Sequence, residues 1–286
     1  MEEKNKVLPS TLYLVGTPIG NLADITDRAK KVLSEVSFIA AEDTRNSQKL
    51  LSALGIHKEL VSYHEHNRRA SGDRIVARLL AGECCALITD AGMPAISDPG
   101  EDLVKDCAKA GVTVSVIPGP CAAVSALALS ALSGRRFCFE GFLSPVAGER
   151  RKRLSALQKE ERTMIFYEAP HKLQKTLADM KECFGDDRKI SLCRELTKLN
   201  EEIQRVTLGE AVRIYSEKEP RGEYVLVVEG FSGNAEDDNA RELSLLEPAE
   251  HVAHYEAQGL KKMDAIKQAS KDRGISKSEL YKILNT

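Results

Sequence analysis

Short apolar runs alternate with amphipathic segments along the first part of the chain, and this alternation most limits the folds open to it. The runs have the length and hydrophobicity of buried strands. They lie at 11–15, 38–41, 60–63, 85–89 and 112–117. Helical periodicity between them is clear at 47–54, 73–81 and 99–110. Strands separated by helices are joined by right-handed crossovers, so the pattern predicts a mostly parallel sheet.

A second block of strands and helices follows at 121–230, and its predicted strands have fewer helices between them. That spacing favours a mixed sheet with some antiparallel pairs. The stretch 231–240 is polar and acidic like an exposed linker, and the periodicity after it is purely helical. The predicted fold class is therefore α/β, with two α/β domains and a small all-helical C-terminal segment. The expected domains are 1–118, 119–232 and 233–286.

Charge and cysteine content narrow the functional classes. The 286 residues include 41 Lys and Arg against 43 Asp and Glu, so no overall positive field attracts nucleic acid. Any such contact must be local, as at 261–286, where seven basic residues oppose three acidic ones. No apolar run approaches about 18 residues and the opening residues are unlike a signal peptide, so we expect a cytoplasmic protein without membrane contact. The seven cysteines lack CxxC spacing, which predicts reduced thiols and no zinc site.

Three loops rich in glycine and proline each follow a predicted parallel strand, at 16–21, 89–100 and 118–122. Open α/β sheets bind ligands at that edge. Glycine lets a ligand approach the backbone, and proline keeps the loop stiff. None of the loops has the spacing of a P-loop or of a dinucleotide fingerprint. The pattern therefore predicts a ligand that is held mainly by backbone groups and carries no triphosphate.

Several phrases of the sequence make a specific resemblance. They lie at 41–45 (AEDTR), 63–67 (YHEHN), 167–171 (YEAPH), 193–198 (CRELTK) and 221–230 (RGEYVLVVEG). Together with the loops, they resemble the bacterial enzymes of the tetrapyrrole methylase superfamily that methylate the ribose 2′-hydroxyl of a cytidine in small-subunit rRNA. The resemblance covers 11–230, and the helical tail is similar to the helix-turn-helix-like segment of those enzymes.

The resemblance implies S-adenosylmethionine (SAM) in a cleft between two α/β domains, no metal, and a homodimer. It also implies small-subunit rRNA as partner, bound as part of the assembled subunit. By position, the implied cofactor residues are Pro18, Asp90, Gly92, Met93, Ile96, Ser97, Pro118, Cys121, Ala122, Phe142 and Tyr167. Two features depart from the family: the second loop is longer than its Gly-Asp-Pro counterpart, and Cys121 stands where Ser is frequent.

Methyl transfer from a sulfonium needs chiefly in-line positioning, but a base that accepts the ribose proton could add roughly 10²–10⁴-fold. The predicted catalytic residues are Glu42, Asp43 and His64, which follow the second and third strands. The two carboxylates point to opposite faces if both are still in the strand, so only one is expected to face the cleft. The predicted substrate-binding residues are Arg45, His66, Arg68, Glu168 and His171.

Alternative hypotheses remain open at this point. His64 and His66 have the i, i+2 spacing of metal ligands, but no third ligand is evident. The basic run at 150–153 fits either phosphate contacts or a solvated helix face. The arginines could also bind the carboxylates of a tetrapyrrole or of another small acidic substrate. A non-enzymatic regulator that reads nucleic acid with its helical tail is the third hypothesis.

Overall fold

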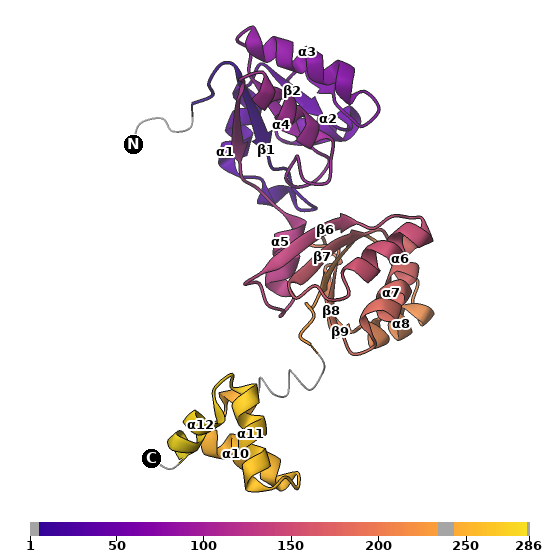
Figure 1. Ribbon diagram of the computed structural model, residues 1–286. Helices are drawn as coiled ribbons and strands as arrows, with labels where there is room; N and C mark the ends of the chain where they lie inside the picture. The colour runs from indigo at the N-terminus through magenta and orange to yellow at the C-terminus, as the bar shows by residue number, and fades with distance from the viewer. Residues whose placement is uncertain (1–5, 234–242, 285–286) are drawn as a thin grey trace. The chain divides into compact units, whose positions relative to one another are not determined.

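The computed structural model describes residues 6–233 and 243–284 (Figure 1). Two five-stranded sheets lie in one compact unit, which spans residues 1–158 and 162–229. A second unit comprises residues 159–161 and the chain from 230 onward. The predicted linker at 231–240 falls mostly outside the described residues. In the described ranges, no helix combines the length and apolar character needed to cross a bilayer.

The first sheet is entirely parallel, with strand order β3-β2-β4-β1-β5, and confirms the predicted alternation. Its strands are β1 (Thr11–Val15), β2 (Phe38–Ala41), β3 (Leu60–Ser62), β4 (Cys85–Ile88) and β5 (Thr113–Ile117). The intervening helices are η1 (Leu22–Asp24), α1 (Asp27–Glu35), α2 (Thr44–Ala53), α3 (Arg68–Leu80) and α4 (Gly100–Lys109). Strand β1 lies between β4 and β5, so the three glycine-rich loops that follow these strands lie side by side.

Both faces of this sheet are buried along β1, β2 and β4, which explains why these strands are nearly continuously apolar. Successive residues of β1 show the alternation, because Leu12 packs with α3 and α4 whereas Tyr13 packs with α1 and α2. The core on the face covered by α3 and α4 includes Ile75 and Leu103, and both are fully buried. Helices on both faces leave the carboxyl edge of the strands open for a ligand.

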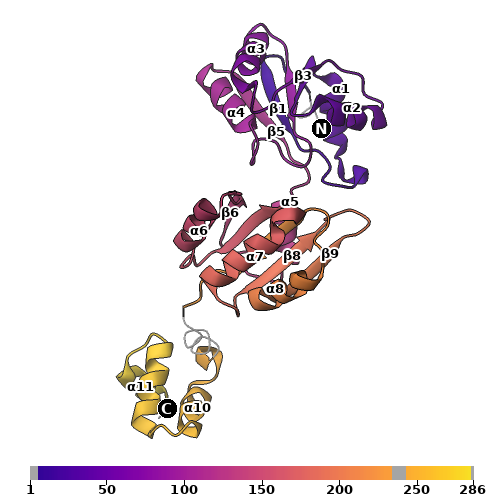
Figure 2. The ribbon, with the colours of Figure 1, turned by 90° about the vertical axis from the view of Figure 1, so that its right-hand side faces the viewer.

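The second sheet is mixed, as predicted, with strand order β6-β7-β10-β8-β9. Strands β6 and β7 are parallel, and the other three pairs are antiparallel. Its strands are β6 (Phe137–Phe142), β7 (Thr163–Glu168), β8 (Lys189–Arg194), β9 (Glu202–Thr207) and β10 (Tyr224–Val228). Helix α5 (Ala122–Leu129) covers one face. The opposite face packs against α6 (Ala147–Ala156), α7 (Pro170–Phe184) and α8 (Leu208–Glu217). Figure 2 shows α7 and α8 lying over this face.

The basic run at 150–153 is largely a solvated helix face, because Arg151, Lys152 and Arg153 are exposed, but Arg150 is buried. Arg150 is 6% exposed, and its guanidinium lies 2.6 Å from Asp179 Oδ2. Arg151 pairs with the other oxygen of the same carboxylate at 2.9 Å. Arg153 pairs with Glu140 on β6. The sequence did not indicate that Arg150 is buried, because its counter-charge, Asp179, lies 29 residues further along the chain.

The C-terminal segment is helical, as predicted, with α10 (Pro248–Ala257), α11 (Lys262–Asp272) and α12 (Lys277–Leu284). A small apolar core that includes Val252 and Leu280 holds them together. A buried polar network adds to it: His251 is fully buried, its Nε2 lies 3.2 Å from Asp272 Oδ2, and its Nδ1 accepts a hydrogen bond from Arg273 Nε. This arrangement requires a neutral imidazole with its proton on Nε2.

Candidate functional site

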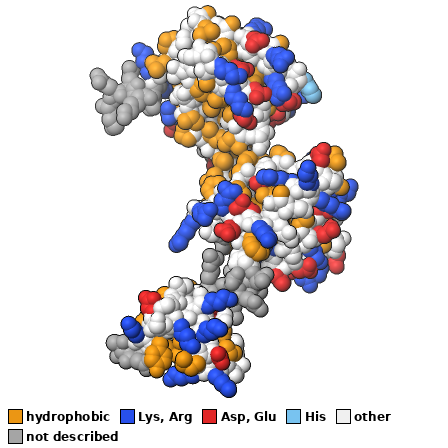
Figure 3. All heavy atoms as spheres, viewed as in Figure 1, with side chains coloured by type: hydrophobic (Ala, Val, Ile, Leu, Met, Phe, Trp, Pro, Cys, Tyr) orange, Lys and Arg blue, Asp and Glu red, His pale blue; other side chains and the backbone are white. Residues whose placement is uncertain are grey.

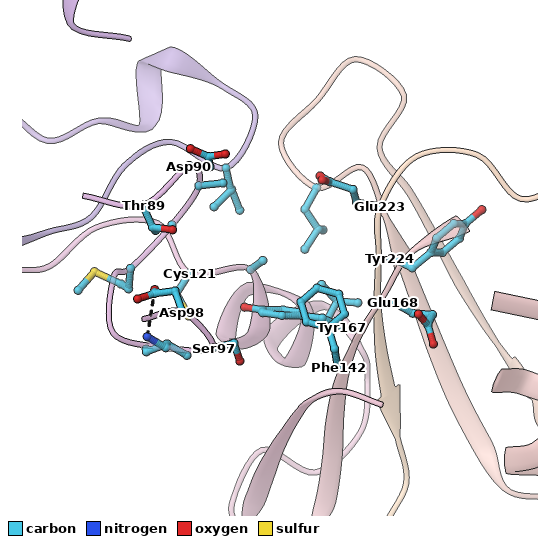
Figure 4. A pocket seen from close by; sticks show the side chains of 18 of the residues that line it. Thr89, Asp90, Ser97, Asp98, Cys121, Phe142, Tyr167, Glu168, Glu223 and Tyr224 are labelled. Atoms are coloured by element: carbon cyan, nitrogen blue, oxygen red, sulfur yellow. Dashed lines mark hydrogen bonds between the residues drawn. The ribbon is translucent and has the colours of Figure 1, made fainter. Parts of the chain in front are cut away.

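A cavity of about 440 Å³ opens at the carboxyl edge of the first sheet and is also lined by the second sheet. Figure 4 shows Thr89, Asp90, Ser97 and Asp98 on one side, with Phe142, Tyr167, Glu168 and Glu223 on the other. The lining comes from the loop after β4, the start of α5, and the ends of β6, β7, β8 and β10. Its size lies in the range of small-molecule sites.

The three glycine-rich loops pack directly on one another. Thr17 and Gly92 exchange two backbone hydrogen bonds, of 2.9 and 3.1 Å. A Cβ on Gly16 would lie only 2.7 Å from Gly119 Cα, so the first and third loops approach too closely for any side chain there. The loops therefore form one continuous backbone surface, as expected for a ligand held by main-chain groups.

The loop after β4 is held in a strained conformation. Ala95 and Ser97 have φ values of 66° and 62°, in the left-handed region that residues with a Cβ rarely adopt. The carboxylate of Asp98 accepts hydrogen bonds from the backbone N–H groups of Ala95 (3.0 Å) and Gly100 (2.7 Å). Asp98 thus fixes the loop and also leads the chain into α4. Strain of this kind concentrates at ligand-binding sites.

Aromatic side chains form the opposite wall. The rings of Phe142 and Tyr167 are tilted against each other with centroids 5.5 Å apart, and Phe139 packs edge-on against Tyr167 at 5.0 Å. Burial raises the pKa of the Tyr167 phenol. Phe142 remains 58% exposed. An exposed ring beside a half-buried one offers a flat apolar surface for a heterocycle.

The predicted cofactor residues converge on this cavity. Nine of them line it: Asp90, Gly92, Met93, Ile96, Ser97, Cys121, Ala122, Phe142 and Tyr167. Pro18 and Pro118 belong to the first and third loops but are absent from the lining. The proline rings restrict the backbone of these two loops.

The predicted catalytic residues separate into different environments. Glu42 lines the cavity, and its Oε2 accepts a hydrogen bond of 3.0 Å from Thr89 Oγ1. Asp43 instead caps α2, and the hydrogen bonds from Arg45 lower the pKa of its carboxyl to about 2. His64 does not line the cavity. Its backbone N–H donates to Asn67 Oδ1, and its buried Nδ1 finds no hydrogen-bond partner among the described residues.

Of the predicted substrate-binding residues, only Glu168 reaches the cavity. Its carboxylate accepts hydrogen bonds from Ala169 N and from Thr176 Oγ1, so it stabilises the end of β7. The others lie outside the lining: Arg45, His66, Arg68 and His171. Arg45 pairs with Asp43, and Arg68 pairs with Glu65 and Asp102. The ring of His66 packs against that of His64, with centroids 5.9 Å apart.

Sequence reasoning assigned no ligand-binding or catalytic role to several lining residues, among them Thr89, Asp98, Glu195, Lys198 and Glu223. The last three belong to the phrases at 193–198 and 221–230, which carried the resemblance without a function for each residue. Their juxtaposition depends on how β8 and β10 pair in the sheet. Across residues 6–233 and 243–284, no three His, Cys, Asp or Glu side chains are placed to hold a metal ion.

Comparison with known proteins gives two kinds of likeness. The family model for tetrapyrrole (corrin/porphyrin) methylases matches residues 11–212. The chain is 48% identical over 273 residues to ribosomal RNA small subunit methyltransferase I of Halalkalibacterium halodurans. This match covers 96% of this chain and 94% of that protein. It is 47% identical over 270 residues to the Bacillus subtilis protein of the same name, with coverages of 94% and 92%.

Solved structures share the fold at lower identity. Uroporphyrin-III-C-methyltransferase from Thermus thermophilus has a TM-score of 0.56 at 21% identity, over 76% of this chain and 94% of that chain. The cobalt precorrin-4 methyltransferase CbiF has the same TM-score at 16% identity, again over 76% and 94%. These likenesses concern the fold and leave the substrate to other observations.

Proposed function

Because the chain belongs to the tetrapyrrole (corrin/porphyrin) methylase family, we propose that it transfers a methyl group from SAM to the ribose 2′-hydroxyl of a cytidine in small-subunit rRNA. The observation that carries the substrate is the extent of the match to the rRNA methyltransferases. The matches to these relatives cover 94–96% of this chain, so they must extend beyond the α/β unit into the helical segment. The solved tetrapyrrole methylases cover 76%.

The cavity suits SAM in size and in its donor set. We assign the polar edges of the cofactor to the backbone of the stacked loops and its adenine to the apolar wall formed by Phe142 and Tyr167. We assign Asp90, Gly92 and Ser97 to the loop side of the cofactor site. Met93, Ile96, Cys121 and Ala122 complete that side.

The cofactor supplies an electrophilic methyl group whose leaving group is a neutral thioether. The protein must orient the ribose oxygen and accept its proton. Among the three predicted catalytic residues, we assign the proton to Glu42, because this carboxylate lines the cavity and Thr89 binds its Oε2 only. Asp43 is too weak a base at a pKa of about 2, and His64 lies outside the lining.

A macromolecular substrate also needs contacts beyond the cavity. We propose that the exposed side chains of Arg45 and Arg68 contact rRNA phosphates, with His66 and His171. Acidic and basic side chains are interspersed over the visible face of the α/β unit, so these contacts are local (Figure 3). We further propose that the assembled small subunit is the substrate, which places the enzyme in the cytoplasm.

The proposed homodimer is supported by apolar surface on the α/β unit. Strand β5 is at the edge of its sheet, and Val116 on it is 49% exposed. Val124 on α5 is 53% exposed. An open edge strand can pair with a second copy of the chain, and exposed apolar side chains can add to such an interface. Light scattering after size-exclusion chromatography measures the oligomeric state directly.

The function is tested by transfer of labelled methyl from SAM to small subunits purified from cells that lack this protein. Nuclease digestion then identifies the labelled nucleotide and the position of the label. Label on a cytidine 2′-oxygen is the expected result. Transfer to naked rRNA alone would exclude the assembled subunit as substrate. No transfer, with SAM binding intact, would redirect the assignment to a small acidic acceptor such as a tetrapyrrole.

A further inference from the structure

A turn between β8 and β9 contributes a lysine to the lining of the cavity, and the mechanism given above does not use it. Lys198 lines the cavity, and its side chain is 30% exposed. Its Nζ lies 2.9 Å from Glu195 Oε1 and 2.9 Å from Glu223 Oε2. Glu195 Oε1 also accepts a hydrogen bond from the backbone N–H of Glu223. The three side chains thus form one connected cluster across the ends of β8 and β10.

Two glycines, Gly20 and Gly222, lack the Cβ that would collide with this cluster. A Cβ on Gly20, in the loop after β1, would collide with the Lys198 side chain. A Cβ on Gly222, just before β10, would lie 2.5 Å from Glu195 Cγ. The stem of the lysine is therefore packed against the loop of the first sheet, and its carboxylate partner is packed against the second. Such packing fixes the direction in which the ammonium points.

The turn itself is strained. Glu195 and Thr197 have φ values of 52° and 66°, in the left-handed region that residues with a Cβ rarely adopt. Thr197 Oγ1 is buried without a hydrogen-bond partner among the described residues. With Ala95 and Ser97, these are four of the six non-glycine residues with positive φ in the described chain. Strain is thus concentrated in two loops that line one cavity.

The charges of the cluster select the kind of group it can bind. Partial burial lowers the pKa of Lys198, but the hydrogen bonds to Glu195 and Glu223 outweigh it, so the pKa is raised and the amine stays protonated. One ammonium and two carboxylates repel a phosphate. An ammonium has three N–H groups, of which two are engaged here. A neutral hydroxyl can accept the third.

We propose that Lys198 is a catalytic residue that donates a hydrogen bond to the oxygen that receives the methyl group. This inference rests on the proposed function. During transfer the O–H bond breaks and its proton passes to Glu42, while the methyl group exchanges its bond to sulfur for a bond to oxygen. At hydrogen-bond distance, the third N–H group stabilises the partial negative charge that develops on this oxygen, whereas a larger phosphate would also meet the two carboxylates. Glu195 and Glu223 are positioning residues that hold the ammonium in place.

The test compares Lys198→Met and Lys198→Arg with a matched control, Lys189→Met. Lys189 lies at the start of β8, pairs with Glu229 and is absent from the cavity lining. SAM affinity is measured by calorimetry, and kcat and KM are measured with small subunits. Loss of one donor to a developing oxyanion lowers kcat by about 10²- to 10³-fold. We expect this loss in Lys198→Met with unchanged SAM affinity and KM, a partial recovery in Lys198→Arg, and wild-type values in the control.

Other outcomes overturn the proposal in recognisable ways. Weaker SAM binding by Lys198→Met would place the ammonium on a hydroxyl or carboxylate of the cofactor. A higher KM at unchanged kcat would indicate a contact that is equally strong before and during transfer. Wild-type kinetics would remove any role. Absence of transfer by the wild-type protein would refute the proposed function itself, and the role of Lys198 with it.

A second set of variants separates chemistry from folding. Glu223 has an 81% exposed side chain, so Glu223→Gln is expected to fold like the wild type. It leaves Lys198 with Glu195 alone, and we expect a loss in kcat of less than about tenfold. Added ethylammonium should raise the rate of Lys198→Ala but not that of Glu42→Gln. Failure of this rescue, in a variant with a wild-type melting temperature, would contradict the catalytic role.

Discussion

Replacing Gly16 by alanine tests whether the stacked loops form the cofactor site. The new Cβ would lie 2.7 Å from Gly119 Cα and 2.8 Å from Met93 Sδ. The sulfur can move, but the backbone of the third loop cannot yield without displacing the start of α5. Overpacking of this kind costs about 1–3 kcal/mol. For a unit of this size, each kcal/mol lowers the melting temperature by about 2–4 °C, so a fall of several degrees is expected.

The same displacement must reach the ligand. If the loops hold SAM, saturation at a hundred times its Kd stabilises the wild-type protein by about 2.7 kcal/mol. Gly16→Ala is expected to show a much smaller upward shift in melting temperature at the same SAM concentration. Thermal unfolding by circular dichroism, with and without SAM, measures both effects, and calorimetry gives the Kd.

Gly148→Ala is the matched control. Gly148 lies near the start of α6 at an ordinary φ, and a Cβ there would meet nothing within 4 Å. This variant should be as stable as the wild type or slightly more so, and it should bind SAM unchanged. A Gly16→Ala protein with the wild-type melting temperature and SAM affinity would show that the loops do not hold the cofactor.

Three further predictions concern other parts of the molecule. Glu42→Gln should lower kcat by about 10²–10⁴-fold while SAM binding is kept, whereas Asp43→Asn should lose far less; equal losses would contradict the assignment of the base. Asp179→Asn should destabilise the α/β unit by about 3–5 kcal/mol in urea unfolding, because it leaves buried Arg150 without its counter-charge. Burial lowers the pKa of His251 below 6.5, so the helical unit should lose stability as the pH falls through that value. His251→Phe should abolish this pH dependence in thermal unfolding.

The sequence predicted most of the architecture because strand and helix periodicities are local signals. It placed the start of α2 too late, at residue 47, because Asp43 caps the helix and extends it back to Thr44. The side chain of Arg45 also donates hydrogen bonds to the Asp43 carboxylate, and the resulting low pKa makes Asp43 a poor base. A carboxylate at a strand end serves equally well as a cap or as a base, and only its neighbours decide.

The site was harder to predict where it depends on long-range packing. The loop residues from Asp90 to Ser97 follow one strand, so their place at the sheet edge could be anticipated. The cluster around Lys198 joins segments that are 25 residues apart and leans on a loop near residue 20. Neither hydrophobic periodicity nor motif spacing in the sequence predicts that these segments lie together. Its only signs in the sequence were two phrases without an assigned chemistry.

The left-handed residues of the two cavity loops carry a consequence for how this protein can vary. Each holds free energy that a relaxed backbone would release, so the most stable sequence for this fold is not the most active one. Substitutions that ease these loops would be favoured by selection for heat resistance and opposed by selection for turnover. Favourable free energy from other parts of the molecule must offset this strain, and burial of both faces of the first sheet is one source of it.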